Sequence, residues 1–143
     1  MKKNLIIFLC VSISIICTYT SCDNGFEDCH NTVLITNNSS KTIYAVGTLK
    51  EGFFNFNPTK EDIADDYRIK PNESTKAKIG IQLSCWEQTL EQTGGYLYIY
   101  IYDAEFLENP ENNWSDAQKH PIKQFKLNAK DLKNMNWEVK YKN

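Results

Sequence analysis

The chain has 143 residues, a formal net charge of −2 and 41% hydrophobic residues, which suits one globular domain. This mildly acidic balance disfavours a nucleic-acid binder, because such proteins are usually basic. Metal cofactors are also disfavoured. The sequence has no CxxC or HExxH spacing for zinc, and the acids within 61–66 lack the loop pattern of a calcium site.

Residues 1–21 have the pattern of an export signal. Lys2 and Lys3 precede an uncharged, mostly apolar stretch over 5–17, and small residues lie directly before Cys22. The apolar stretch is shorter than the roughly 20 residues that span a bilayer. The segment resembles a bacterial lipoprotein signal, with Tyr19 where an aliphatic residue is usual. The resemblance implies that Cys22 is acylated and becomes the first mature residue. A plain secretory signal or an uncleaved anchor are the alternatives.

Cleavage at this site would set both the charge and the organisation of the mature chain. It removes two lysines and no acid, so the net charge falls from −2 to −4, which argues against a polybasic second anchor. We expect residues 22–31 to be a flexible tether and 32–143 the folded domain. The domain would face water from the outer membrane of the cell envelope, on its periplasmic or its surface side.

Two cysteines remain after cleavage and acylation. Cys10 and Cys17 leave with the signal, and Cys22 takes the lipid, which leaves Cys29 and Cys85. An exported domain permits a disulfide between them, but the sequence gives no distance between the two residues. The alternative is that Cys29 lies in the tether and Cys85 is a small buried apolar group.

Strand patterns dominate the first half of the domain. The β-branched segments 32–36 and 42–48 flank an asparagine-rich turn and predict a hairpin. A single helical turn is expected within 61–66, a strand end near 67–70, and a further strand over 75–83.

The second half contains the clearest strand. In 95–103, three aliphatic residues alternate with four tyrosines, so both faces are apolar and the strand should be central in its sheet. Short helices are expected over 103–108 and 129–135, with Asn128 as the cap of the second and Asn136 as its left-handed end. Strands follow over 121–127 and 137–141. The pattern predicts an all-β fold, a single antiparallel β-sandwich, immunoglobulin-like or similar, with six or seven strands and one to three helical turns.

Aromatic residues make up 13% of the chain and are its remaining functional signal. Rings of tyrosine and tryptophan stack on sugars and anchor protein partners. The candidate recognition residues are Trp114, Trp86, Tyr98 and Tyr100, with Trp114 foremost because it lies in the polar loop 109–116. The alternative is that these rings fill the core or its rim.

Several short motifs lie across the mature chain, at 38–44, 69–74, 85–87, 97–106, 125–127, 131–132 and 136–137. In these segments the chain resembles small, uncharacterised lipoproteins of Bacteroidetes. The resemblance implies an envelope location and a compact single domain. It transfers no catalytic residue.

The sequence favours a non-enzymatic module over an enzyme. His30 and His120 belong to no serine, cysteine or metal motif, although Cys85 and either histidine are a formal dyad. We expect a lipid-anchored binding module for a glycan or a protein, with no cofactor. The alternative is a small periplasmic inhibitor or immunity-type protein, which would present a rigid loop from 52–66 or 109–116.

Overall fold

The computed structural model describes residues 29–52, 57–60, 63–77 and 85–143. The predicted signal, Cys22 and most of the tether lie outside these residues. The strands are β1 (Leu34–Asn37), β2 (Ile43–Thr48), β3 (Arg68–Ile69), β4 (Ser74–Lys76), β5 (Leu97–Asp103), β6 (Lys123–Leu127) and β7 (Glu138–Tyr141). The helices are α2 (Ala64–Tyr67), α3 (Trp86–Gln92), α4 (Ala104–Glu108), α5 (Trp114–Ala117) and α6 (Ala129–Asn134).

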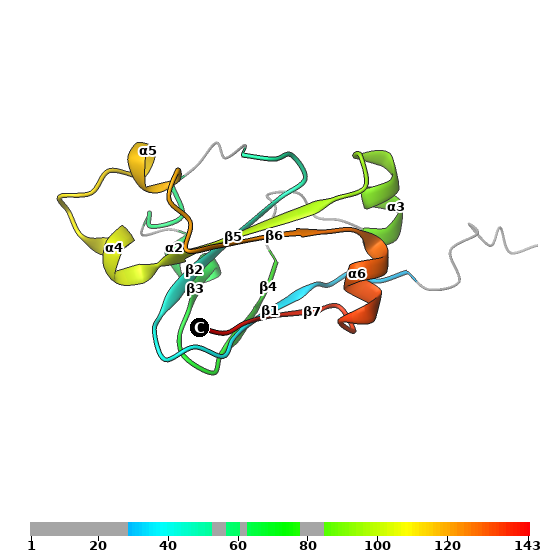
Figure 1. Ribbon diagram of the computed structural model, residues 1–143, viewed down its shortest axis with the longest axis horizontal. Coiled ribbons are helices and arrows are strands. Elements are labelled where there is room, and N and C mark those ends of the chain that lie inside the picture. Colours follow the sequence, from blue (N-terminus) through cyan, green and yellow to red (C-terminus); the bar gives the residue numbers. More distant parts are fainter. Residues whose placement is uncertain (1–28, 53–56, 61–62, 78–84) are drawn as a thin grey trace, which may run out of the picture.

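The described strands form two sheets, which confirms the prediction of a β-rich domain. One sheet has the order β4-β1-β7 and the other the order β3-β2-β5-β6 (Figure 1). β5 is central in its sheet, as its two apolar faces predict. The prediction of purely antiparallel pairing is wrong at one place, because β1 and β7 run parallel.

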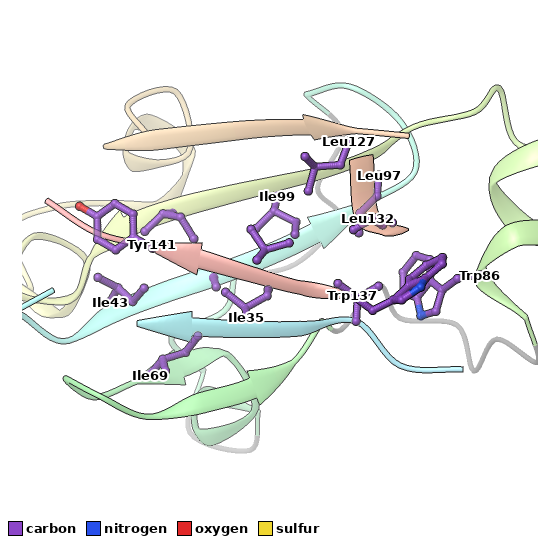
Figure 2. Close-up of a cluster of buried hydrophobic side chains, with 14 of the residues drawn as sticks. Ile35, Ile43, Ile69, Trp86, Leu97, Ile99, Leu127, Leu132, Trp137 and Tyr141 are labelled. Atoms are coloured by element: carbon purple, nitrogen blue, oxygen red, sulfur yellow. The ribbon is translucent and has the colours of Figure 1, made fainter. Parts of the chain in front are cut away.

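Aliphatic side chains from both sheets meet in one core. The alternating residues Leu97, Ile99 and Ile101 of β5 are fully buried there, together with Ile35 of β1 and Val139 of β7. Figure 2 shows this core with Trp86 and Trp137 at one end and Tyr141 at the other. A strand with period two delivers every second side chain to the same face, which is why β5 supplies so much of the core.

The predicted hairpin between 32–36 and 42–48 is wrong. β1 and β2 belong to different sheets, because β4 and β7 already occupy the two edges of β1. The buried Asn37 side chain stabilises the crossing: its Nδ2 donates to the carbonyls of Lys41 and Ile69, and its Oδ1 accepts from the Ser39 backbone and hydroxyl. The asparagine-rich turn therefore connects two sheets and not two neighbouring strands.

Helices are more numerous than predicted. α4 and α6 confirm the two predicted near 103–108 and 129–135, and α2 lies at the end of the expected turn in 61–66, of which residues 61–62 are not described. The capping box of Asn128 and Asp131 is present, and Asn136 has a positive φ of 51°. α3 and α5 were not predicted from the sequence. β4 is the described part of the predicted strand 75–83, whose residues 78–83 are not described.

The tyrosine face of β5 is also buried, under a helical layer. Tyr98, Tyr100 and Tyr102 pack with residues from α2, α4 and α5 in a second core. The four-stranded sheet β3-β2-β5-β6 thus lies between an aliphatic core and an aromatic core. α3 and α6 lie at one end of the sheets, and the C-terminus and α4 lie at the other (Figure 1).

Candidate functional site

The aromatic residues singled out from the sequence are largely covered. Trp86 is 3% exposed and belongs to the aliphatic core, while Tyr98 and Tyr100 are 7% and 5% exposed in the aromatic core. Trp114 is half-buried at the start of α5 and meets the ring of Tyr102 edge-on, with 5.4 Å between centroids. The burial of Trp86, Tyr98 and Tyr100 leaves little of their ring surface for a ligand. Two other features of the domain gather polar side chains.

The first feature is a cluster at the α3–α6 end, formed by Cys29, His30, Cys85 and Glu87 and called here the thiol cluster. The sulfur atoms of Cys29 and Cys85 and a Glu87 oxygen all lie within 4.8 Å of one another. His30 Nδ1 lies 2.6 Å from Glu87 Oε1, and the His30 backbone N–H donates to Oε2 at 3.0 Å. The structure therefore brings both candidate cysteines and one of the two histidines together. His120 follows α5 on an exposed segment.

Local structure explains how this cluster is assembled. Cys85 is the extended residue before α3, and the Trp86 backbone N–H donates to the His30 carbonyl at 2.8 Å. The His30 ring stacks on Trp137, with 4.3 Å between centroids. Trp137 itself has a positive φ of 59°, a conformation that costs a non-glycine residue about 1–2 kcal/mol. His30, expected from the sequence to lie in the tether, thus packs against the domain.

The electrostatics of the cluster disfavour a catalytic role for Cys29 as an activated nucleophile. The hydrogen bond with the Cys85 thiol raises the pKa of Cys29 to about 11, with smaller contributions from desolvation and from Glu87. Nucleophilic cysteines need a lowered pKa. Desolvation opposes ionisation of Glu87, but the backbone and ring of His30 outweigh it and hold the pKa of Glu87 below its ordinary value. The Cys85 sulfur donates to Glu87 and not to a histidine, which is not the order of a cysteine–histidine–acid triad.

The second feature is a pocket of about 260 Å³ at the opposite end, called here the end pocket. It is lined by Ser39, Lys41, Ile43, Asp103, Ile122, Tyr141 and Asn143. Lys41 Nζ lies 3.1 Å from Asp103 Oδ2 and 3.8 Å from Glu105 Oε2, and these carboxylates raise the pKa of Lys41. Ile122 is 49% exposed and adds an apolar rim. The pocket offers a cation, a carboxylate, an amide and apolar carbon in a small space.

The parallel pairing of β1 and β7 places these two features apart. The chain passes from His30 into β1 at the thiol-cluster end, and both strands run away from it. Both strands end at the pocket, where Ser39 and Tyr141 lie. Figure 1 shows the same separation, with α3 and α6 opposite the C-terminus.

Sequence reasoning missed Glu87 and the end pocket. Glu87 lies two residues after Cys85, in the segment Cys85-Trp86-Glu87 on which the family resemblance partly rests. The sequence does not indicate that Glu87 contacts His30, 57 residues away. Nothing in the sequence pattern joins Lys41 to Asp103, which are 62 residues apart.

Comparison with family models, with curated proteins and with solved structures gives no match. Among the described residues, no helix has the length and apolar character needed to cross a bilayer.

Proposed function

We propose that this chain is a lipid-anchored protein of the bacterial cell envelope whose β-sandwich acts as a non-enzymatic binding module. The signal-like segment before Cys22 and the resemblance to small lipoproteins of Bacteroidetes support the location. The shared core between the two sheets supports a sandwich arrangement, and the immunoglobulin-like form of it stays a prediction.

One observation carries the binding role: the chain enters the domain at one end and the end pocket opens at the other. A domain tethered through Cys22 would therefore direct the end pocket away from the membrane. Pockets for drug-sized ligands measure about 300–1,000 Å³, so this pocket suits a smaller group such as one sugar ring. The amide of Asn143 and the charges of Lys41 and Asp103 match hydroxyl groups, and Ile122 matches the carbon face of a sugar.

The location is tested by fractionation and acyl labelling. Cys22→Ala should abolish labelling and release a soluble form, since the lipid is the proposed anchor. An unchanged membrane fraction would contradict lipid anchoring.

The binding role is tested by probing a glycan array with the soluble Cys22→Ala form. Lys41→Ala should weaken binding roughly tenfold or more, because a charge-assisted hydrogen bond is lost. Lys130→Ala, an exposed lysine on α6 at the other end, is the matched control and should bind normally. If no glycan is retained, the glycan ligand is wrong, and if Lys41→Ala binds normally, the site is not the end pocket.

A second candidate function is the inhibitor or immunity-type protein, which needs a rigid loop. The segment between α4 and α5 has that character: Asn109 Oδ1 accepts from the Glu111 backbone, and Asn112 Nδ2 donates to the Phe106 carbonyl. It lies at the end away from α3 (Figure 1). The other predicted loop, 52–66, is only partly described.

Capture of proteins from the native envelope separates the two functions. An inhibitor should retain one enzyme, and the loop substitution Glu111→Lys should abolish this retention while Lys41→Ala does not. A glycan-binding module should show the reverse dependence.

A further inference from the structure

The segment before β1 lies directly against the start of α3. The His30 carbonyl accepts from the Trp86 N–H at 2.8 Å, and the residue directly before each of these is a cysteine. The Glu87 carboxylate holds the same segment a second time, through the backbone and ring of His30. Cys29 and Cys85 are therefore held in proximity by three contacts that do not involve either sulfur.

We propose that Cys29 and Cys85 form a disulfide in the mature protein, which closes the tether onto α3. Both are thiols in this structure, within 4.8 Å of each other. The inference rests on the proposed function for its oxidising compartment. The oxidant is the disulfide of a protein of the thiol–disulfide oxidoreductase class. The Cys29 and Cys85 thiols together lose two protons and two electrons and form the S–S bond, and the S–S bond of the oxidant breaks, takes up these protons and electrons and leaves as a dithiol.

A soft metal ion bound by the two sulfurs and Glu87 is the competing use of this cluster. The hydrogen bonds of Glu87 count against it, because Oε1 is bonded to the His30 ring and Oε2 to the His30 N–H and the Cys85 thiol. A metal ion would have to displace the contacts that bring the two cysteines together. A disulfide keeps them.

The bridge would shorten the distance between the membrane and the domain. From Cys22 to Cys29 the chain spans at most about 25 Å when fully extended, against about 40 Å from Cys22 to Leu34 if the segment 29–33 came away from the domain. The thiol-cluster end would then stay close to the bilayer, and the end pocket would point outward. The bridge would thus fix orientation as well as attachment.

The experiment is thiol counting on the full chain isolated under N-ethylmaleimide, with peptide mapping. The mature chain should carry no maleimide adduct before reduction and two after it, and non-reducing digestion should yield one peptide pair joined through Cys29 and Cys85. Two adducts without reduction would overturn the proposal. Two adducts that appear only after a chelator would overturn it in favour of a metal site.

The same counting on the Cys22→Ala variant separates this inference from the location. Membrane fractionation reports the anchor, and alkylation reports the bridge, so either can fail alone. The closing of the tether onto the domain is tested by limited proteolysis of the segment before β1. Cys29→Ser, which changes an exposed residue, should be cut at least tenfold faster than the native chain. Equal rates would contradict the closing of the tether.

Discussion

The two ends of the domain are held by different kinds of contact. At the thiol-cluster end, the bond between His30 and Glu87 joins residues 57 positions apart. At the opposite end, the ion pair of Lys41 and Asp103 joins residues 62 positions apart, and its two side chains are more exposed than those of His30 and Glu87, respectively. Exposed ion pairs contribute little to stability, whereas the His30 ring also stacks on Trp137. We therefore expect the long-range contact of the thiol-cluster end to stabilise the fold more than the Lys41–Asp103 pair does.

Among changes at either end, breaking the proposed disulfide is expected to lower the free energy of unfolding most. Cys29→Ser should lower the free energy of unfolding by about 4 kcal/mol, because the cross-link between residues 29 and 85 closes a long loop in the unfolded chain. Guanidinium unfolding of the soluble Cys22→Ala form, with and without reductant, measures it. Identical midpoints in both conditions would show that no bridge contributes.

The second-largest loss of stability is expected at the pocket end, where Asn37 holds the connection between β1 and β2. Asn37→Ala removes the partners of the Lys41 and Ile69 carbonyls and of Ser39, at a residue that is fully buried. We expect a loss of about 3 kcal/mol, since each unsatisfied buried group costs about 1–3 kcal/mol. Asn38→Ala, one residue on and exposed, is the matched control and should change stability by less than about 0.5 kcal/mol. Equal effects at both positions would refute the role of Asn37.

A smaller difference is expected between the helix caps of the two ends. Asn128 of α6 is part-buried and forms a reciprocal capping box with Asp131, whereas Asn113 of α5 is exposed where it caps. Asn128→Ala should cost about 1.5 kcal/mol and Asn113→Ala about 0.5 kcal/mol. Thermal unfolding of the two variants side by side measures this, and a larger cost at Asn113 would reverse the comparison.

The smallest expected effect is the acid sensitivity of the thiol-cluster end. The folded pKa of Glu87 lies below its ordinary value of 4.5 because His30 holds the carboxylate. Its contribution to stability is therefore present above that ordinary value and is lost as the pH falls through the folded pKa. Fluorescence of the tryptophans, including Trp137 stacked on His30, should change in this range before the domain unfolds. Glu87→Gln should flatten the change, and an identical profile would exclude Glu87 as its source.

The sequence predicts what each strand contains better than what it pairs with. Alternation in β5 indicates both of its buried faces and its central position, and capping chemistry predicts α6 from Asn128 and Asp131. Neither pattern carries information on partners, so the pairing of β1 with β7 and the separation of β1 from β2 were not predictable. α3 was missed although most of its residues, Glu, Gln and Leu, favour a helix; a helix of seven residues is marginal by itself, and it is the packing of Trp86 and Leu90 into the core that stabilises it.

Of the thiol cluster, the two cysteines were predictable from the sequence, whereas Glu87 and the arrangement of the cluster were not. Cys29 and Cys85 stand out once the signal cysteines are set aside, but only the fold shows that they meet. The tyrosines of β5 were predicted correctly to share one face, but the sequence does not show that α2, α4 and α5 cover this face. The end pocket is lined by the connection between β1 and β2 and by residues of β2, β5, β7 and the C-terminus, together with Ile122 before β6, so no single segment indicates it.

The parallel pairing of β1 with β7 has a consequence for how the protein is made. The Thr36 hydroxyl donates to Glu138, 102 residues later in the chain, at 2.6 Å. As the chain leaves the ribosome, or emerges from an export channel, β1 can therefore pair with β4 but lacks its second neighbour, β7, until nearly all of the domain has followed. Such long-range pairing makes folding slow. A chain built this way completes this sheet only when its last described strand has emerged, and a product that stops before β7 lacks the strand that completes it.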